Sequence, residues 1–145
     1  MKEKGYKFRD HTADIEIFSW GQDLCEAYEQ TALSLMETIS PDLEKIDPKI
    51  KKELEVTAED KEALLFDFLS EFLYIFDVEN LIFSEIKVET IEKINDEYQL
   101  KASMKGEQFD RDNHEIGTEV KAITYSFMEI KEEEDKVEIS IVFDI

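Results

Sequence analysis

Carboxylates at the ends of two predicted strands are the side chains in this sequence with the clearest potential for chemistry. Asp14 follows the run His11-Thr12-Ala13 and stands where a turn becomes a strand. Asp144 ends the last predicted strand, one residue before Ile145, whose carboxylate would add further oxygens. Carboxylates and backbone carbonyls are hard oxygen ligands that suit calcium or magnesium. Two interpretations stay open on the residues alone: a metal site, or acids that bind turn N–H groups and solvent.

Lys121 is a third residue of interest, in a predicted strand over 119–131. On that strand it shares a face with Ile123, Tyr125 and Phe127. A lysine among such residues either extends its ammonium group to solvent at the sheet rim or pairs with a carboxylate. Asp14 and Asp144 are the candidate partners, but both are far away in sequence, so spacing leaves the choice open.

Other residues that often carry chemistry point to structural roles. The sequence has no glycine-rich phosphate loop, no EF-hand spacing of acids and no CxxC or HExxH motif. Cys25 lies beside Leu24 in a predicted helix, where a small core side chain is the expected role. As the only cysteine it cannot form an internal disulfide, which agrees with a reducing compartment. His114 lies in a predicted loop over 106–117 and is expected to be solvated.

The charge balance limits the classes of partner. The 145 residues include 37 acids and 17 lysines or arginines, which gives a formal net charge of −20. Such a surface disfavours direct binding to nucleic-acid phosphates and to anionic membranes, and it favours cations, basic proteins or simply solubility. The sequence has no long apolar run and no signal-peptide core near Met1, so the simplest location is the cytoplasm.

Apolar spacing predicts one α+β domain over residues 1–145. Strands are predicted at 5–9, 14–20, 50–57, 81–91, 97–105, 119–131 and 136–145. Asp23, with Glu26 three residues later, predicts the start of an amphipathic helix over 24–39. Asp60 predicts the start of a second helix, which is apolar around most of its circumference. Helices come early and strands dominate late, which favours two helices packed on one largely antiparallel β-sheet.

Together these residues resemble the archease family over essentially the whole chain. The shared features are His11-Thr12-Ala13-Asp14-Ile15, Gly21 with the helix after Asp23, Ala63-Leu64-Leu65 continuing to Phe68-Leu69, Gly106-Glu107, Val120-Lys121-Ala122-Ile123-Thr124-Tyr125 and the final Asp144-Ile145. Each motif alone is weak, but their order and spacing form a specific combination. Ser126 departs from the pattern, because many members have histidine there, and no histidine role is expected at that position.

The resemblance implies a small acidic protein that assists a tRNA-splicing RNA ligase. That ligase joins RNA ends bearing a 2′,3′-cyclic phosphate or 3′-phosphate to a 5′-hydroxyl, using a guanylylated histidine of its own and a divalent metal. The implied function is a non-catalytic activator that promotes guanylylation and multiple turnover. The implied metal ligands are Asp14, Asp144 and Ile145, with calcium as the first candidate ion. Asp14 and Lys121 are the residues implied in activation, and His11 is a candidate supporting residue.

Two other functions stay open on the sequence. One is a chaperone-like protein that keeps partners such as a tRNA methyltransferase soluble, a role that the acidic surface would suit. The other is a metal-dependent hydrolase, which is disfavoured because no general base pair or nucleophile stands out. Removal of Asp14 and Asp144 separates the ligase activator from the chaperone-like protein, since chaperoning through surface charge should survive those changes.

Overall fold

The chain folds into strands, helices and connecting loops in the order expected of an α+β protein. The structure, a computed structural model, describes residues 3–10 and 13–145, so His11 and Thr12 lie outside the described residues. The elements are β1 (Gly5–Asp10), β2 (Asp14–Gly21), α1 (Leu24–Ile39), the 3-10 turn η1 (Leu43–Lys45), β3 (Ile50–Ala58), α2 (Lys61–Glu79), β4 (Leu81–Ile94), β5 (Glu97–Gln108), β6 (Ala122–Ile123), β7 (Glu129–Glu133) and β8 (Lys136–Asp144). The α+β class, with two α-helices in these described ranges, is confirmed.

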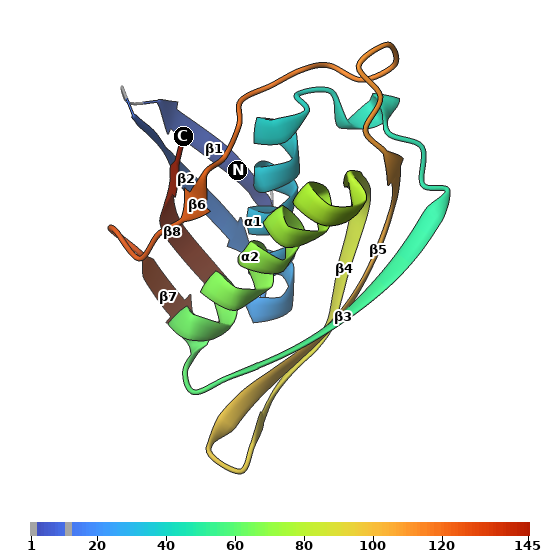
Figure 1. Ribbon diagram of the computed structural model, residues 1–145. Helices are drawn as coiled ribbons and strands as arrows, with labels where there is room; N and C mark the ends of the chain where they lie inside the picture. The colour runs from blue at the N-terminus through green and yellow to red at the C-terminus, as the bar shows by residue number, and fades with distance from the viewer. Residues whose placement is uncertain (1–2, 11–12) are drawn as a thin grey trace.

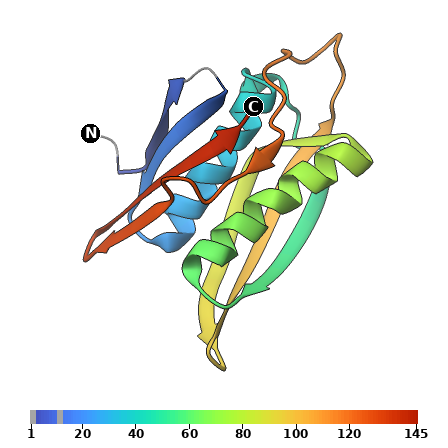
Figure 2. The ribbon, with the colours of Figure 1, turned by 60° about the vertical axis from the view of Figure 1, so that its left-hand side comes forward.

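The strands form two antiparallel sheets, where the sequence analysis expected the helices to cover one. The first sheet has the order β1-β2-β8-β6, and β7 also pairs with β8. The second sheet has the order β3-β5-β4. Both helices lie between the two sheets (Figures 1 and 2). A helix that is apolar around most of its circumference, as α2 is, cannot bury all of its side chains against one sheet, and a second sheet covers the remainder.

The helices begin at the predicted residues. The Asp23 carboxylate accepts a hydrogen bond from the Glu26 N–H at 2.9 Å, and the Asp60 carboxylate accepts one from the Ala63 N–H at 2.7 Å. These side chains satisfy N–H groups that the first helical turn leaves without intrahelical acceptors. Asn80 ends α2 in the left-handed conformation, with φ of 58°. In the described part of the chain, no helix is long and apolar enough to span a membrane.

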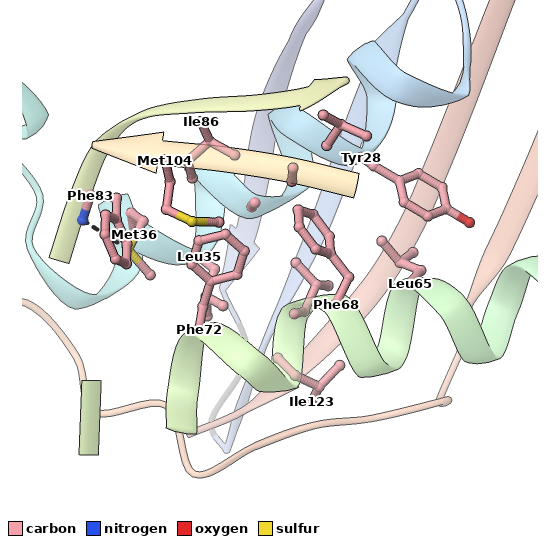
Figure 3. Packing of buried hydrophobic residues seen from close by; sticks show 14 of the residues in the cluster. Tyr28, Leu35, Met36, Leu65, Phe68, Phe72, Phe83, Ile86, Met104 and Ile123 are labelled. Atoms are coloured by element: carbon pink, nitrogen blue, oxygen red, sulfur yellow. Dashed lines mark hydrogen bonds between the residues drawn. The ribbon is translucent and has the colours of Figure 1, made fainter. Parts of the chain in front are cut away.

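The core is a continuous set of aromatic and aliphatic side chains between the sheets. Phe68 packs edge-on against Phe72, with ring centroids 5.1 Å apart, and Phe72 packs in the same way against Phe83 of β4 at 5.9 Å. Figure 3 shows these rings together with Ile123 of β6, which lies beneath α2. Ile123 is only 4% exposed, so it anchors the short strand β6 to the core.

The predicted strand over 119–131 is wrong at its start, over 119–121, and in its middle, over 124–128. The chain forms β6, turns, and resumes as β7, and the Met128 N–H donates to the Tyr125 carbonyl at 3.1 Å within the turn. Thr124 causes the break, because its hydroxyl donates to the Val142 carbonyl at 2.8 Å and accepts from the Ser126 N–H at 3.2 Å. Phe127 therefore does not share a buried face with Ile123.

The prediction that His114 is solvated is also wrong, since its side chain is 1% exposed. The Asp110 N–H donates to His114 Nδ1 at 2.9 Å, and His114 Nε2 lies 2.8 Å from the Glu107 carboxylate. The ring also stacks on Phe109 at 5.8 Å. Because Nδ1 accepts a hydrogen bond, Nε2 is the nitrogen that carries the proton toward Glu107. The histidine fixes the start of the loop between β5 and β6.

Candidate functional site

The pairing of β2 with β8 brings the two candidate aspartates together. Asp14 lies directly opposite Asp144 in the antiparallel register, and the Ile145 N–H extends the ladder to the Ala13 carbonyl at 3.1 Å. Opposed residues on antiparallel strands point to the same face, with Cβ atoms about 4.5–5.5 Å apart. Two carboxylates from opposite ends of the sequence therefore lie side by side where the two central strands of the first sheet end.

The alternation of apolar residues decides which face the aspartates occupy. Ile15, Ile17 and Ser19 of β2 point inward, and the Ser19 hydroxyl lies 2.6 Å from the Thr31 hydroxyl of α1. Asp14 has the opposite parity, so its side chain points away from the helices. We call this the outer face of the first sheet. A slip of the register by one residue would bury the aspartates and expose the isoleucines, which burial energy strongly disfavours.

Lys121 reaches the same place through the β5–β6 connection. The Lys121 N–H donates to the Asp144 carbonyl at 2.8 Å, and Ala122 pairs with Asp144 in the β6–β8 register. The Lys121 side chain is exposed, and no ion pair joins its ammonium group to Asp14 or Asp144 within the described ranges. The structure thus brings the backbone of Lys121 to the site, while a polar pair with either carboxylate stays a prediction.

The connection itself is held against the end of α1. The N–H groups of Gly117 and Thr118 donate to the carbonyls of Ile39 and Thr38 at 2.9 and 2.8 Å. These carbonyls belong to the last helical turn, which leaves them without intrahelical donors. A Cβ atom on Gly117 would lie 2.3 Å from the Thr38 oxygen, so only glycine allows this close approach. The helix end therefore sets the path of the chain that leads to Lys121.

A hollow of about 410 Å³ lies beside Asp14 on the outer face. Its lining residues are Arg9, Asp14, Glu16, Phe127 and Val142. Arg9 lies 4.0 Å from the Glu16 carboxylate and 5.9 Å from the ring of Phe18. Phe127, which the sequence analysis placed on a strand, is thus a site residue that it missed. No periodic signal could have found it, because its place depends on the turn that interrupts the predicted strand.

The donor set at Asp14 and Asp144 suits a hard divalent cation but does not complete its coordination. The described residues contain no group of three or more His, Cys, Asp or Glu side chains that could hold a metal ion. A cation here would take two carboxylates and fill its remaining positions from main-chain oxygens at Ile145, from water or from a partner. Like charges directly opposite each other repel, and a cation relieves that repulsion. His11 lies outside the described residues, so its supporting role stays a prediction.

Cys25 has the surroundings of a structural cysteine. It packs partly buried against the hydrophobic core, as predicted. Burial is the main reason that the pKa of its thiol is raised, with a smaller contribution from the nearby Asp23 carboxylate. A raised pKa leaves little thiolate at neutral pH, and the thiolate is the reactive form of cysteine.

Fold and site together define a small, acidic α+β protein that presents paired carboxylates on an open sheet face. The Archease protein family (MTH1598/TM1083) matches residues 6–145. The archease-like protein of Dictyostelium discoideum is 39% identical over 145 residues, which cover 98% of this chain and 94% of that protein. The archease of Pyrococcus furiosus is 45% identical over 122 residues, 84% of each chain. This chain therefore belongs to the archease family.

Solved structures support the same fold. The solution structure of protein 1598 from Methanobacterium thermoautotrophicum matches with a TM-score of 0.84 and 35% identity, covering 97% of this chain and 99% of that one. The crystal structure of an archease from Thermotoga maritima, described as a possible chaperone, matches with a TM-score of 0.59 and 23% identity over 96% of each chain. At that identity the second likeness shows the fold alone.

Proposed function

We propose that this protein is a non-catalytic activator of the tRNA-splicing RNA ligase, as membership of the archease family suggests. The end of the first sheet that carries Asp14 and Asp144 enters the ligase's active-site cleft. There it promotes guanylylation of the ligase histidine and multiple turnover. The observation that carries the proposal is the register of β2 and β8, which places Asp14 opposite Asp144 on the outer face. Paired carboxylates on the outer face of the sheet can contact another protein, whereas a buried pair could not do so.

The proposed role of each residue follows from its position. Asp14 and Asp144 hold a divalent cation, with calcium as the first candidate, and a main-chain oxygen of Ile145 is a third ligand. When bound, the cation neutralises the two carboxylates and supplies positive charge where β2 and β8 end. Lys121, held next to Asp144 through its main-chain hydrogen bond, offsets local negative charge or meets a phosphate in the ligase cleft.

The overall charge supports delivery to a protein rather than to RNA. A net charge of −20 is attracted to a cleft that holds metal ions and basic side chains, and this attraction raises the rate of encounter. The same charge repels the phosphates of free RNA. In the proposal, the ligase alone binds the RNA substrate.

The test is the yield of labelled ligase–GMP formed from GTP and a divalent metal in the presence of this protein. We expect Asp14→Asn and Asp144→Asn to lower that yield toward the level of the ligase alone. Glu138→Gln is the matched control, because Glu138 is an exposed carboxylate on the same strand and the same outward face. Wild-type stimulation by Asp14→Asn, with its fold intact, would contradict the proposal.

A second candidate function is chaperone-like protection of an RNA-modifying enzyme such as a tRNA methyltransferase. It is favoured by the net charge of −20, because a strongly charged surface helps to keep a bound partner in solution. Light scattering by a heated methyltransferase measures such protection. Protection that survives the Asp14→Asn/Asp144→Asn double substitution would support this function, and no suppression of aggregation by the wild type would refute it.

A further inference from the structure

Phe127 combines exposure with an unfavourable backbone conformation. Its side chain is 79% exposed, which is the largest exposed fraction among the large hydrophobic residues described. Its φ of 54° lies in the left-handed region, which bulky side chains rarely adopt. Neither feature stabilises the fold of the unbound protein, because the exposed ring gains little from burial and the backbone at Phe127 is strained. A residue of this kind points to a function outside the fold itself.

The turn that carries Phe127 is held firmly in place. The Ser140 hydroxyl of β8 donates to the Phe127 carbonyl at 3.0 Å, and the Met128 N–H donates to the Tyr125 carbonyl at 3.1 Å. On the other side of the turn, the Tyr125 ring stacks on Phe66 of α2, with centroids 4.4 Å apart and planes 7° apart. The ring of Phe127 is therefore presented from an ordered turn, which lowers the entropy lost when a partner covers it.

Phe127 adjoins the paired carboxylates and an apolar strip on the outer face. It lines the hollow of about 410 Å³ together with Asp14 and Val142. A second hollow of about 620 Å³ on this face is lined in part by Phe18 and Trp20. We call Phe18, Phe127 and Val142 the apolar strip; Phe18 is half-buried and Val142 is only 5% exposed, so Phe127 supplies most of its exposed area. This strip ends beside Asp14, one of the two carboxylates that the proposed function uses.

We propose that the apolar strip, with Phe127 at its centre, is a docking surface for a protein partner that has an apolar pocket with a basic rim. This inference rests on the proposed function and adds the contact that holds the partner while the carboxylates act. Aromatic side chains, phenylalanine among them, are enriched at the centres of protein–protein interfaces. The rim of the strip carries Asp14, Glu16 and Asp144, which complement a basic surface.

The charge also decides between occupants. A second copy of this chain would bring another net charge of −20 to the interface, and nucleic acid would bring phosphates. Both would be repelled by the carboxylates beside Phe127. Three basic side chains also lie on this face: Lys7 and Arg9 lie 5.7 and 5.9 Å from the ring of Phe18, and Lys131 lines the second hollow. The acids that line the two hollows outnumber them, namely Asp14, Glu16, Glu129 and Glu138. A basic protein surface is therefore the occupant that the face fits.

The test separates binding from activation by measuring ligase guanylylation as a function of the concentration of this protein. We expect Phe127→Ala to raise the half-maximal concentration about tenfold while leaving the yield at saturation unchanged. Phe127→Gly should do the same and keep the fold, because glycine relieves the positive φ. Tyr74→Ala is the matched control, since Tyr74 is a 62% exposed aromatic residue on α2, and it should change neither quantity.

The outcomes are distinguishable. No stimulation by the wild type at any concentration would refute the proposed function and this inference with it. Stimulation by Phe127→Ala and Phe127→Gly at wild-type concentrations would overturn the docking surface alone. A wild-type dimer that Phe127→Ala dissociates, or RNA binding that the substitution abolishes, would assign the strip to another occupant and would also overturn the inference.

Discussion

Replacing Asp14 by asparagine should stabilise the metal-free protein, because it removes the repulsion between two facing carboxylates. The register places Asp14 opposite Asp144, and facing Cβ atoms lie about 5 Å apart. Two unit charges at about 5 Å repel by about 0.8 kcal/mol at the dielectric constant of water. We therefore expect Asp14→Asn to raise the free energy of unfolding by about 0.5–1 kcal/mol in a chelating, low-salt buffer.

Calcium should reverse the order of stability. At about ten times its dissociation constant, a ligand that binds only the folded protein adds about 1.4 kcal/mol. The wild type should gain this amount and Asp14→Asn should not. Urea unfolding, followed by circular dichroism with and without calcium, measures both effects. A lower stability of Asp14→Asn in chelator would refute the reasoning, because it would mean that the Asp14 carboxylate accepts stabilising hydrogen bonds from the turn.

Three further predictions concern the connection that carries Lys121 to the site. Gly117→Ala should cost about 1–3 kcal/mol of unfolding free energy, because its Cβ would meet the Thr38 oxygen at 2.3 Å, and it should also weaken ligase activation by displacing β6. His114→Ala should cost about 2 kcal/mol in urea unfolding, because it removes a buried ring that packs on Phe109 and accepts the Asp110 N–H. The Asp47 N–H, and then the His114 ring, lower the pKa of Glu107. This carboxylate therefore stabilises the fold above its unfolded pKa, and the contribution is lost as the pH falls through its folded pKa. Glu107→Gln should make the free energy of unfolding fall less steeply below about pH 5. An unchanged pH dependence there would contradict the role given to the Glu107 carboxylate.

The elements that the sequence predicts well are those with local signals. The N-caps Asp23 and Asp60 form the expected hydrogen bonds, and the last predicted strand, over 136–145, is present as β8. Such features depend on neighbouring residues, which a linear pattern contains. The division into two sheets is not local, because it depends on which strands pair, and alternation along one strand carries no information about its partner.

The wrong predictions for residues 119–131 and for His114 have the same cause, which is hydrogen bonding to partners that a local pattern does not show. Residues 119–131 alternate like a strand, but hydrogen bonds from the Thr124 hydroxyl to β8 interrupt it. His114 is buried because Glu107 and the Asp110 N–H satisfy both of its ring nitrogens, and a loop pattern does not indicate such partners. For the site, the sequence proposes Asp14 and Asp144 separately. Their meeting follows from the β2–β8 register, which only the folded chain provides.

The central claim is that a divalent cation binds between Asp14 and Asp144, and paramagnetic broadening by Mn²⁺ in an NMR spectrum tests it most directly. The amides beside the pair include those of Asp14 and Asp144 themselves and those of Lys121 and Ile145, which donate to the Asp144 and Ala13 carbonyls. We predict that substoichiometric Mn²⁺ broadens these amides first and that the Asp14→Asn/Asp144→Asn double substitution removes the effect. Broadening that instead begins at the acidic turn over 132–135, or that survives the double substitution, would contradict the account.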